Sequence, residues 1–213
     1  SSDVCSSDLY DPYDKLKLLP LDMQGWNSQA SIFGRIIEEL KPKLIVEVGT
    51  WKGASAIHMA KECLKYTDDF EIVCIDTWLG SVEHWSGVSQ ELPRNDFING
   101  RPNLYNQFLS NIVHNNLEKY ITPFPVDSIN GGLTLELMIE RANAKKPDLI
   151  YIDAGHEYFS VKCDFYLYSK LVRDGGKILG DDFYHGPVSN AARETFGDDK
   201  VVDAGEGKFV WIK

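Results

Sequence analysis

The stretch Leu44-Ile-Val-Glu-Val-Gly-Thr-Trp-Lys-Gly-Ala-Ser-Ala56 decides the fold that this sequence predicts. It begins with an apolar, β-branched run, which is typical of a strand buried on both faces of a parallel sheet. Gly49 and Gly53 follow, and the small and apolar residues after them predict a helix. Strand, glycine turn and helix begin a nucleotide-type βαβ unit, because glycines allow close backbone approach and a helix N-terminus favours negative charge. An ordinary turn is the structural alternative.

The spacing of the glycines in this turn, and the acidic residues around it, limit the classes of ligand that the turn can bind. Gly-Thr-Trp-Lys-Gly is not the G-x-G-x-x-G of NAD and FAD domains, and it lacks the Gly-Lys-Ser/Thr end of a P-loop. Glu47 lies inside the apolar strand, where it requires a cation or a hydroxyl partner. Asp76 ends the next apolar run, residues 71–76, where Rossmann-like sheets carry the acid that binds ribose hydroxyls.

The stretch Val46-Glu-Val-Gly-Thr-Trp-Lys-Gly-Ala-Ser55 resembles the first motif of class I S-adenosylmethionine-dependent methyltransferases. It is most similar to the metal-dependent O-methyltransferases, which include sugar, antibiotic and catechol-type enzymes. The resemblance extends from about residue 25 to residue 213 and is weak over residues 79–118. It implies methyl transfer from S-adenosylmethionine to a hydroxyl group of a small molecule or sugar.

Composition limits the other partners. The 213 residues carry a formal net charge of −10, which argues against a nucleic-acid partner and a polybasic membrane anchor. No apolar run approaches the ~20 residues of a membrane span. Cys63, Cys74 and Cys163 fall on apolar faces of predicted elements, which favours free thiols in a reducing, cytoplasmic compartment. Association into a homo-oligomer is left open.

The sequence predicts one domain that follows a short non-native segment at the N-terminus. Residues 1–9 show no signal-peptide pattern and can be back-translated to a common sequencing-adapter oligonucleotide, so we expect a non-native scar. Residues 10–213 are predicted to form a single methyltransferase domain with a lid-like insertion at about 79–118, because part of that stretch is polar, glycine-bearing and aromatic. A solvated surface excursion is the alternative.

Strands alternate with helices, which predicts an α/β fold: a Rossmann-like, doubly wound, mostly parallel seven-stranded sheet with a C-terminal antiparallel hairpin. The parallel strands are expected at 44–48, 71–76, 121–126, 148–153 and 177–181, and the hairpin at 201–203 and 208–212. Asn27 or Ser28 is expected to cap a helix that ends at Pro42, and Pro102 to begin another.

Carboxylates stand at or near the carboxyl end of each predicted parallel strand, namely Glu47, Asp76, Asp127, Asp153 and Asp181. Ligands of doubly wound sheets bind at this edge, so this convergence is the strongest physical indication of a site. The resemblance implies these cofactor-binding residues: Glu47, Gly49, Thr50, Gly53, Ser55, Asp76, Asp127, Ser128 and Asp153. By that resemblance Glu47 and Ser55 hold the methionine end and Asp76 the ribose. Asp127 and Ser128 face the adenine, with a helix cap as their structural alternative.

Asp153, Asp181 and Asp182 come from adjacent predicted strand ends. Crowded carboxylates repel unless a cation binds or some are protonated, and all-oxygen ligands suit Mg²⁺, Ca²⁺ or Mn²⁺ better than zinc. The resemblance implies that these three residues bind a divalent metal, with Mg²⁺ as the expected ion. The alternative is a loop start with a helix cap nearby.

His156 follows Asp153 by three residues, where the resembling family places its general base, a lysine in the catechol branch and a histidine in the sugar branch. An alcohol is a poor nucleophile, so metal coordination and a base with a pKa near neutrality would activate it. His84 and His185 are weaker candidates. We therefore predict a metal-assisted O-methyltransferase, with a metal-independent methyltransferase or a non-catalytic S-adenosylmethionine-binding module as alternatives. The missing G-x-G-x-x-G disfavours an NAD dehydrogenase.

Overall fold

The computed structural model describes residues 11–86, 92 and 97–213, so the predicted scar at 1–9 and part of the predicted lid lie outside the described residues. A seven-stranded sheet with the order β5-β2-β1-β6-β7-β9-β8 forms its centre. The parallel strands are β1 (Leu44–Val48), β2 (Glu71–Ile75), β5 (Ile121–Phe124), β6 (Leu149–Ile152) and β7 (Lys177–Gly180). The antiparallel hairpin consists of β8 (Val202–Gly205) and β9 (Lys208–Ile212). The predicted fold class is confirmed.

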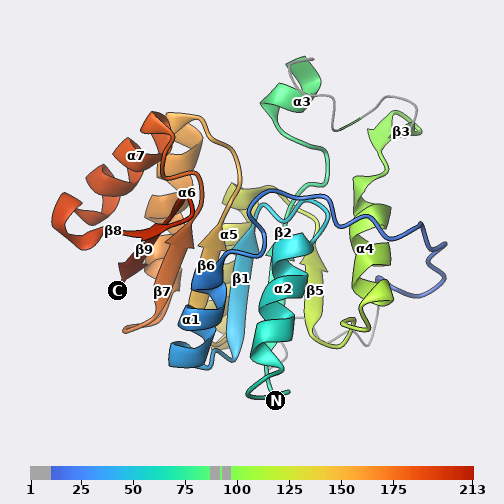
Figure 1. The fold of residues 1–213 in the computed structure, drawn as a ribbon, viewed down its shortest axis with the longest axis horizontal. Helices are drawn as coiled ribbons and strands as arrows, with labels where there is room; N and C mark the ends of the chain where they lie inside the picture. The colour runs from blue at the N-terminus through green and yellow to red at the C-terminus, as the bar shows by residue number, and fades with distance from the viewer. Residues whose placement is uncertain (1–10, 87–91, 93–96) are drawn as a thin grey trace.

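Two apolar cores separate the sheet from its helices. The first core joins the sheet to α1 (Ser31–Leu40), α2 (Ala54–Cys63) and α4 (Leu104–His114). The second joins it to α5 (Ser128–Ala142), α6 (Tyr158–Leu171) and α7 (Gly186–Phe196). In β1, Ile45 belongs to the first core and Val46 to the second, because successive strand side chains point to opposite faces. Figure 1 shows α1 and α2 in front of the sheet and α5 behind it.

Four of the five parallel strands end one or two residues earlier than predicted. Asp76, Asp153 and Asp181 therefore lie one residue beyond the ends of β2, β6 and β7, in the turns that follow these strands. The remaining short elements are α3 (Val82–Ser86), the two-stranded sheet of β3 (Phe97–Ile98) and β4 (Arg101–Pro102), and a 3₁₀ turn at Asp198–Lys200. Figure 1 shows α3 standing beyond the end of the sheet.

Two predicted helix starts are wrong. Helix α1 begins at Ser31, and neither Asn27 nor Ser28 caps it; instead Glu206 accepts the Ser31 backbone N–H at 2.8 Å. Pro102 pairs with Phe97 between β3 and β4, so α4 begins only at Leu104. In both cases a contact with another segment replaces the local signal that the sequence offered.

The predicted position of Cys163 also needs correction, and the range of the predicted lid-like insertion contains a packed helix. Cys163 is exposed, because α6 buries the face that carries Val161, Phe165 and Tyr168. Within the lid-like range, residues 104–114 form α4, whose buried face belongs to the first core. Among the described residues no helix is both long enough and apolar enough to cross a membrane.

Candidate active site

The turn after β1 and the turn after β6 meet where the order of strands reverses. Gly49 has φ +81°, and a Cβ there would lie 2.0 Å from the carbonyl oxygen of Asp153, so this position accepts only glycine. Gly53 has φ +84° and precedes α2, with Phe108 2.9 Å from its would-be Cβ. The glycines therefore allow two turns and α4 to close around the switch point, where ligands of doubly wound sheets bind.

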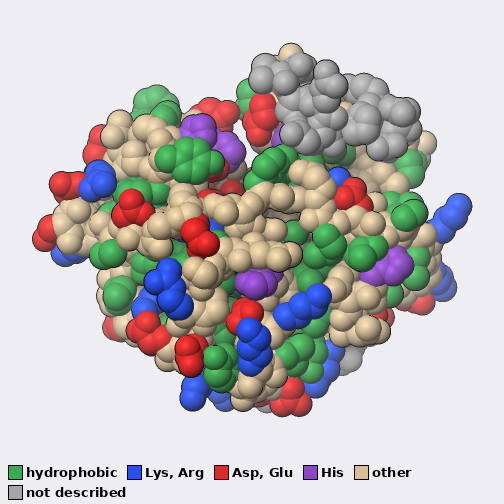
Figure 2. All heavy atoms as spheres, in the orientation of Figure 1, with side chains coloured by type: hydrophobic (Ala, Val, Ile, Leu, Met, Phe, Trp, Pro, Cys, Tyr) green, Lys and Arg blue, Asp and Glu red, His purple; other side chains and the backbone are tan. Residues whose placement is uncertain are grey.

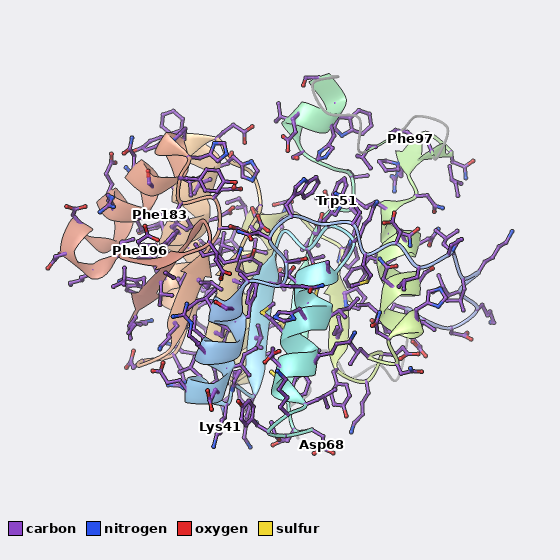
Figure 3. All side chains as sticks on the ribbon, viewed as in Figure 1. Lys41, Trp51, Asp68, Phe97, Phe183 and Phe196 are labelled. Carbon is purple, nitrogen blue, oxygen red and sulfur yellow. The ribbon has the colours of Figure 1, made fainter. Side chains whose placement is uncertain are left out.

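A cavity of about 530 Å³ runs along this edge of the sheet, within the range of small-molecule sites. Of the predicted site residues, those lining it are Gly49, Thr50, Ser55, Asp76, Asp127, Ser128, Asp153, His156, Asp181 and Asp182. The lining does not include Glu47 or Gly53. Figure 3 shows Trp51, which also lines the cavity, at one end of the sheet and Lys41 and Asp68 at the other.

Glu47 lies beneath the cavity floor and is fully buried. Its two carboxylate oxygens accept hydrogen bonds from the hydroxyls of Thr50 and Ser55, and the Cys74 thiol lies 3.6 Å away. Burial raises the pKa of Glu47 to about 7. The predicted hydroxyl partners are therefore present, and Glu47 reaches the cavity only through the two side chains that it orients.

Asp76 and Asp127 both hold backbone at the cavity wall. Asp76 Oδ2 accepts the N–H groups of Thr50 and Trp51, each at 2.9 Å, and so fixes the glycine turn. Asp127 Oδ1 accepts the N–H of Asn130 at 2.9 Å and caps α5, which is the helix-cap alternative. The carbonyl of Ser128 accepts the Tyr168 hydroxyl at 2.7 Å, so the start of α5 is tied to α6.

Asp153, His156 and Asp182 come together after β6 and β7. One ligand atom of each lies within 4.8 Å of the others, which is compact enough for a single metal ion. His156 Nε2 lies 2.8 Å from Asp182 Oδ2, and this hydrogen bond is the main reason that the pKa of His156 is raised to about 9. Burial and the neighbouring Asp181 raise the pKa of Asp153 to about 8. Figure 2 shows histidine and acidic side chains together near α7.

Asp181 lies beside this group with its carboxylate turned into the protein. Its Oδ1 accepts the Asp182 N–H at 2.8 Å. Its Oδ2 accepts the Tyr151 hydroxyl at 2.6 Å and the ammonium of Lys208. The structure thus brings Asp153 and Asp182 together with His156, and it engages Asp181 in a buried ion pair.

Comparison with known proteins agrees with this geometry. A family model described as a methyltransferase domain matches residues 46–183. The chain belongs to this methyltransferase family. The methyltransferase is also 26% identical over 139 residues to an uncharacterised protein, R132, of Acanthamoeba polyphaga mimivirus. The match covers 65% of this chain, and the chain spans only half the length of that protein.

Solved structures share the fold of the methyltransferase. An O-methyltransferase from Bacillus cereus in complex with SAH aligns over 92% of this chain and 84% of its own, with 17% identity and a TM-score of 0.56. TomG of Streptomyces achromogenes, involved in tomaymycin synthesis and solved with SAM, covers 92% and 83% with 14% identity and a TM-score of 0.60. The O-methyltransferase NovP covers 87% and 79% with 15% identity and a TM-score of 0.59. The predicted class I methyltransferase fold is confirmed.

The methyltransferase also has an aromatic wall that sequence reasoning missed. Trp51 stacks on His84 with ring centroids 4.7 Å apart and contacts Trp26 at 5.7 Å, and all three line the cavity. Tyr184, which also lines it, packs on His185. Trp51 lies inside the glycine turn, which was a usable signal. Trp26 lies in the irregular segment before α1, residues 11–30, which we call the lead-in and which offered none.

Proposed function

We propose that this methyltransferase transfers the methyl group of S-adenosylmethionine to a hydroxyl oxygen of a small molecule or sugar, assisted by a divalent metal. One observation carries the proposal: a cavity of cofactor size extends across the ends of five neighbouring strands to a compact group of Asp153, His156 and Asp182. The chain shares its fold with proteins named as O-methyltransferases, which supports the reaction class.

The proposed cofactor contacts follow the order of the strands. Asp127 and Ser128, after β5, would face the adenine, and Asp76, after β2, the ribose. Thr50 and Ser55, oriented by Glu47, would hold the methionine end. Bound S-adenosylmethionine would supply an activated methyl group, and the chain's task is to orient it toward the acceptor oxygen.

The donor set at the far end suits a hard cation. Mg²⁺ needs only one or two protein carboxylates and keeps water and substrate oxygens for its other positions, so Asp153 and Asp182 suffice to hold it. A bound divalent cation would lower the pKa of an acceptor hydroxyl at this place.

His156 is our proposed general base. Its side chain is 42% exposed at the cavity, and Asp182 holds Nε2 by a hydrogen bond, which leaves Nδ1 to face other groups. The hydroxyl proton would pass to the imidazole as the acceptor oxygen takes the methyl group. Because the two aspartates favour the protonated imidazole, neutralising their charge would help His156 to act as a base.

A metal-independent reaction is the second candidate, and one observation favours it. Asp181 is paired with Lys208 and Asp182 with His156, so two of the three predicted metal ligands have a cationic partner within the protein itself. In that case the His156–Asp182 pair alone would activate the acceptor.

The deciding experiment combines binding with turnover. Calorimetry should detect binding of S-adenosylhomocysteine. In a panel of sugars, catechols and other hydroxylated molecules, at least one acceptor should be methylated in the presence of Mg²⁺ and not in excess chelator. His156→Ala should lower turnover by ~10²–10⁴-fold, the usual share of general-base catalysis, while retaining S-adenosylhomocysteine affinity. His114→Ala, an exposed histidine on α4, is the matched control.

Each outcome separates the candidates. Full turnover in chelator would favour the metal-independent reaction. Tight S-adenosylhomocysteine binding without methylation of any acceptor would favour the non-catalytic binding module. Binding of NADH in place of S-adenosylhomocysteine would contradict the proposal as a whole.

A further inference from the structure

The side chain of Lys208 is completely buried below the acidic end of the cavity. It lies in β9 on the side of the first core, with its ammonium 5.4 Å from the ring centroid of Phe33 and 5.3 Å from that of Tyr151. A buried ammonium destabilises a fold unless it is paired and hydrogen-bonded, and an apolar residue would fill the same space without that cost. Its presence therefore requires an explanation from its partners.

The partner of Lys208 is Asp181, one of the three predicted metal ligands. Asp181 is only 7% exposed, and both of its oxygens are engaged. One accepts the Asp182 N–H, and the other accepts both the Tyr151 hydroxyl and the Lys208 ammonium. The charge of Asp181 is thus compensated from below, by a cation that belongs to the chain.

Asp153 and Asp182 are engaged differently from Asp181: Asp153 Oδ2 accepts the Tyr151 hydroxyl at 2.9 Å, and Asp182 is paired with the partly exposed His156 rather than with a buried lysine. Within residues 11–86, 92 and 97–213, the ion pairs found for Asp182 involve only histidines, and none is found for Asp153. Their oxygens lie in the compact group with His156, to which Asp181 does not belong. Asp153 and Asp182 therefore each place an oxygen in the compact group, whereas both oxygens of Asp181 are engaged by other groups of the chain.

We propose that Lys208 is a built-in cation that withholds Asp181 from the metal. The divalent ion is then held by Asp153 and Asp182, and the nearby ammonium weakens its binding by repulsion and by occupying the third carboxylate. This inference rests on the metal-assisted function proposed above. It also implies that the acidic site keeps its shape when no metal is bound, because Lys208 and Tyr151 fix the carboxylates from within.

Three aspartate variants test which carboxylates bind the ion, using Mn²⁺ alone as the probe in calorimetry of the metal-stripped full chain. Asp153→Asn and Asp182→Asn should each weaken Mn²⁺ binding by about ten-fold or more. Replacing the buried pair together, in Asp181→Asn/Lys208→Met, should change it by less than about three-fold, because Asp181 is not a ligand and no unpaired ammonium is left behind. Weakening by this double variant equal to that by Asp182→Asn would overturn the inference.

Lys208→Met tests the competition directly. It frees Asp181, so the affinity for Mn²⁺ should rise by about ten-fold and the rise in Tm caused by Mn²⁺ should exceed that of the parent. Lys177→Met is the matched control: Lys177 is 6% exposed and paired with Glu39, and its loss should not alter Mn²⁺ binding. An unchanged or weakened Mn²⁺ affinity in Lys208→Met would refute the proposal.

The remaining outcomes are also decisive. If Lys208→Met fails to fold, the double variant Lys208→Met/Asp181→Asn removes both buried charges and should bind Mn²⁺ about as tightly as the parent does. If the parent binds no Mn²⁺ and Lys208→Met binds it, the metal-assisted function fails while the competition is supported. If neither binds Mn²⁺, both proposals fail.

Discussion

The titration of Glu47 makes the stability of the fold depend on pH. Its carboxyl is fully buried among Thr50, Ser55 and Cys74, with Asp76 nearby, and burial raises its pKa from 4.5 to about 7. Between these values the folded protein holds a proton that the unfolded chain has released. The contribution of Glu47 to the stability of the parent therefore falls as pH rises from about 4.5 to about 7 and stays at the lower level above it.

Glu47→Gln removes this titration. The free energy of unfolding of the variant minus that of the parent should increase by about 2–4 kcal/mol between pH 5 and pH 8, since each pKa unit corresponds to about 1.4 kcal/mol. Urea denaturation at a series of pH values measures the difference. Curves for the two proteins that run parallel over this range would show that Glu47 does not retain its proton.

At the scale of single residues, the sequence predicted what a strand pattern can carry. An acid in an apolar run had to find a hydroxyl or a cation, and Glu47 finds two hydroxyls three and eight residues away. The inward turn of Asp181 could not be predicted. Its partner Lys208 begins a strand, where a lysine usually reaches solvent, and only the pairing of β7 with β9 places it in the core.

Helix α4 anchors the lead-in through Asn111. This fully buried side chain accepts the Asp22 N–H at 3.0 Å and donates to the carbonyls of Asp22 and Lys52 at 2.6 and 2.8 Å. It therefore joins three elements: the lead-in, α4 and the glycine turn. The lead-in in turn supplies Trp26 to the cavity wall.

Asn111→Ala should lower the free energy of unfolding by about 2–4 kcal/mol, because buried backbone groups lose their partners at about 1–3 kcal/mol each. It should also weaken S-adenosylhomocysteine binding, since the lead-in and the glycine turn, which both line the cavity, lose their anchor. Chemical denaturation and calorimetry measure the two effects. Asn106→Ala, on the exposed face of the same helix, is the control, and equal effects of the two substitutions would argue against this anchoring role.

At the scale of elements, Pro102 predicted a helix close to the place where α4 begins, but the role of the lead-in escaped prediction. The lead-in has no repeat, and its hydrogen bonds go to side chains about 90 residues away in sequence. Contacts of that separation leave no local pattern. The same limit explains why α1 appeared to be capped by Asn27 or Ser28.

The start of α1 and the C-terminal hairpin meet beside the cavity. The Ser31 N–H and hydroxyl at the start of α1 donate to Glu206 Oε2 at 2.8 and 3.0 Å, and Asn27 donates to the Glu206 carbonyl. Glu206 lies in the turn of the C-terminal hairpin that also carries Lys208. An anion at a helix N-terminus is stabilising, so Glu206 stabilises the start of α1 and joins it to the C-terminal hairpin.

Glu206→Ala should remove the contact between the start of α1 and the hairpin without disturbing the core. Loss of an N-terminal cap costs about 1 kcal/mol, which corresponds to a Tm lower by about 2–4 °C in a chain of this size. Glu206→Gln should recover part of the loss, because the amide oxygen still accepts the Ser31 N–H while the charge is gone. Hydrogen exchange should accelerate at the first turn of α1 and leave the sheet unchanged, since only the contact between α1 and the hairpin turn is lost. Glu140→Ala, an exposed acid on α5, is the control for removing a carboxylate from a chain of net charge −10. An equal Tm for Glu206→Ala and Glu140→Ala would show that the contact between α1 and the hairpin contributes nothing to stability.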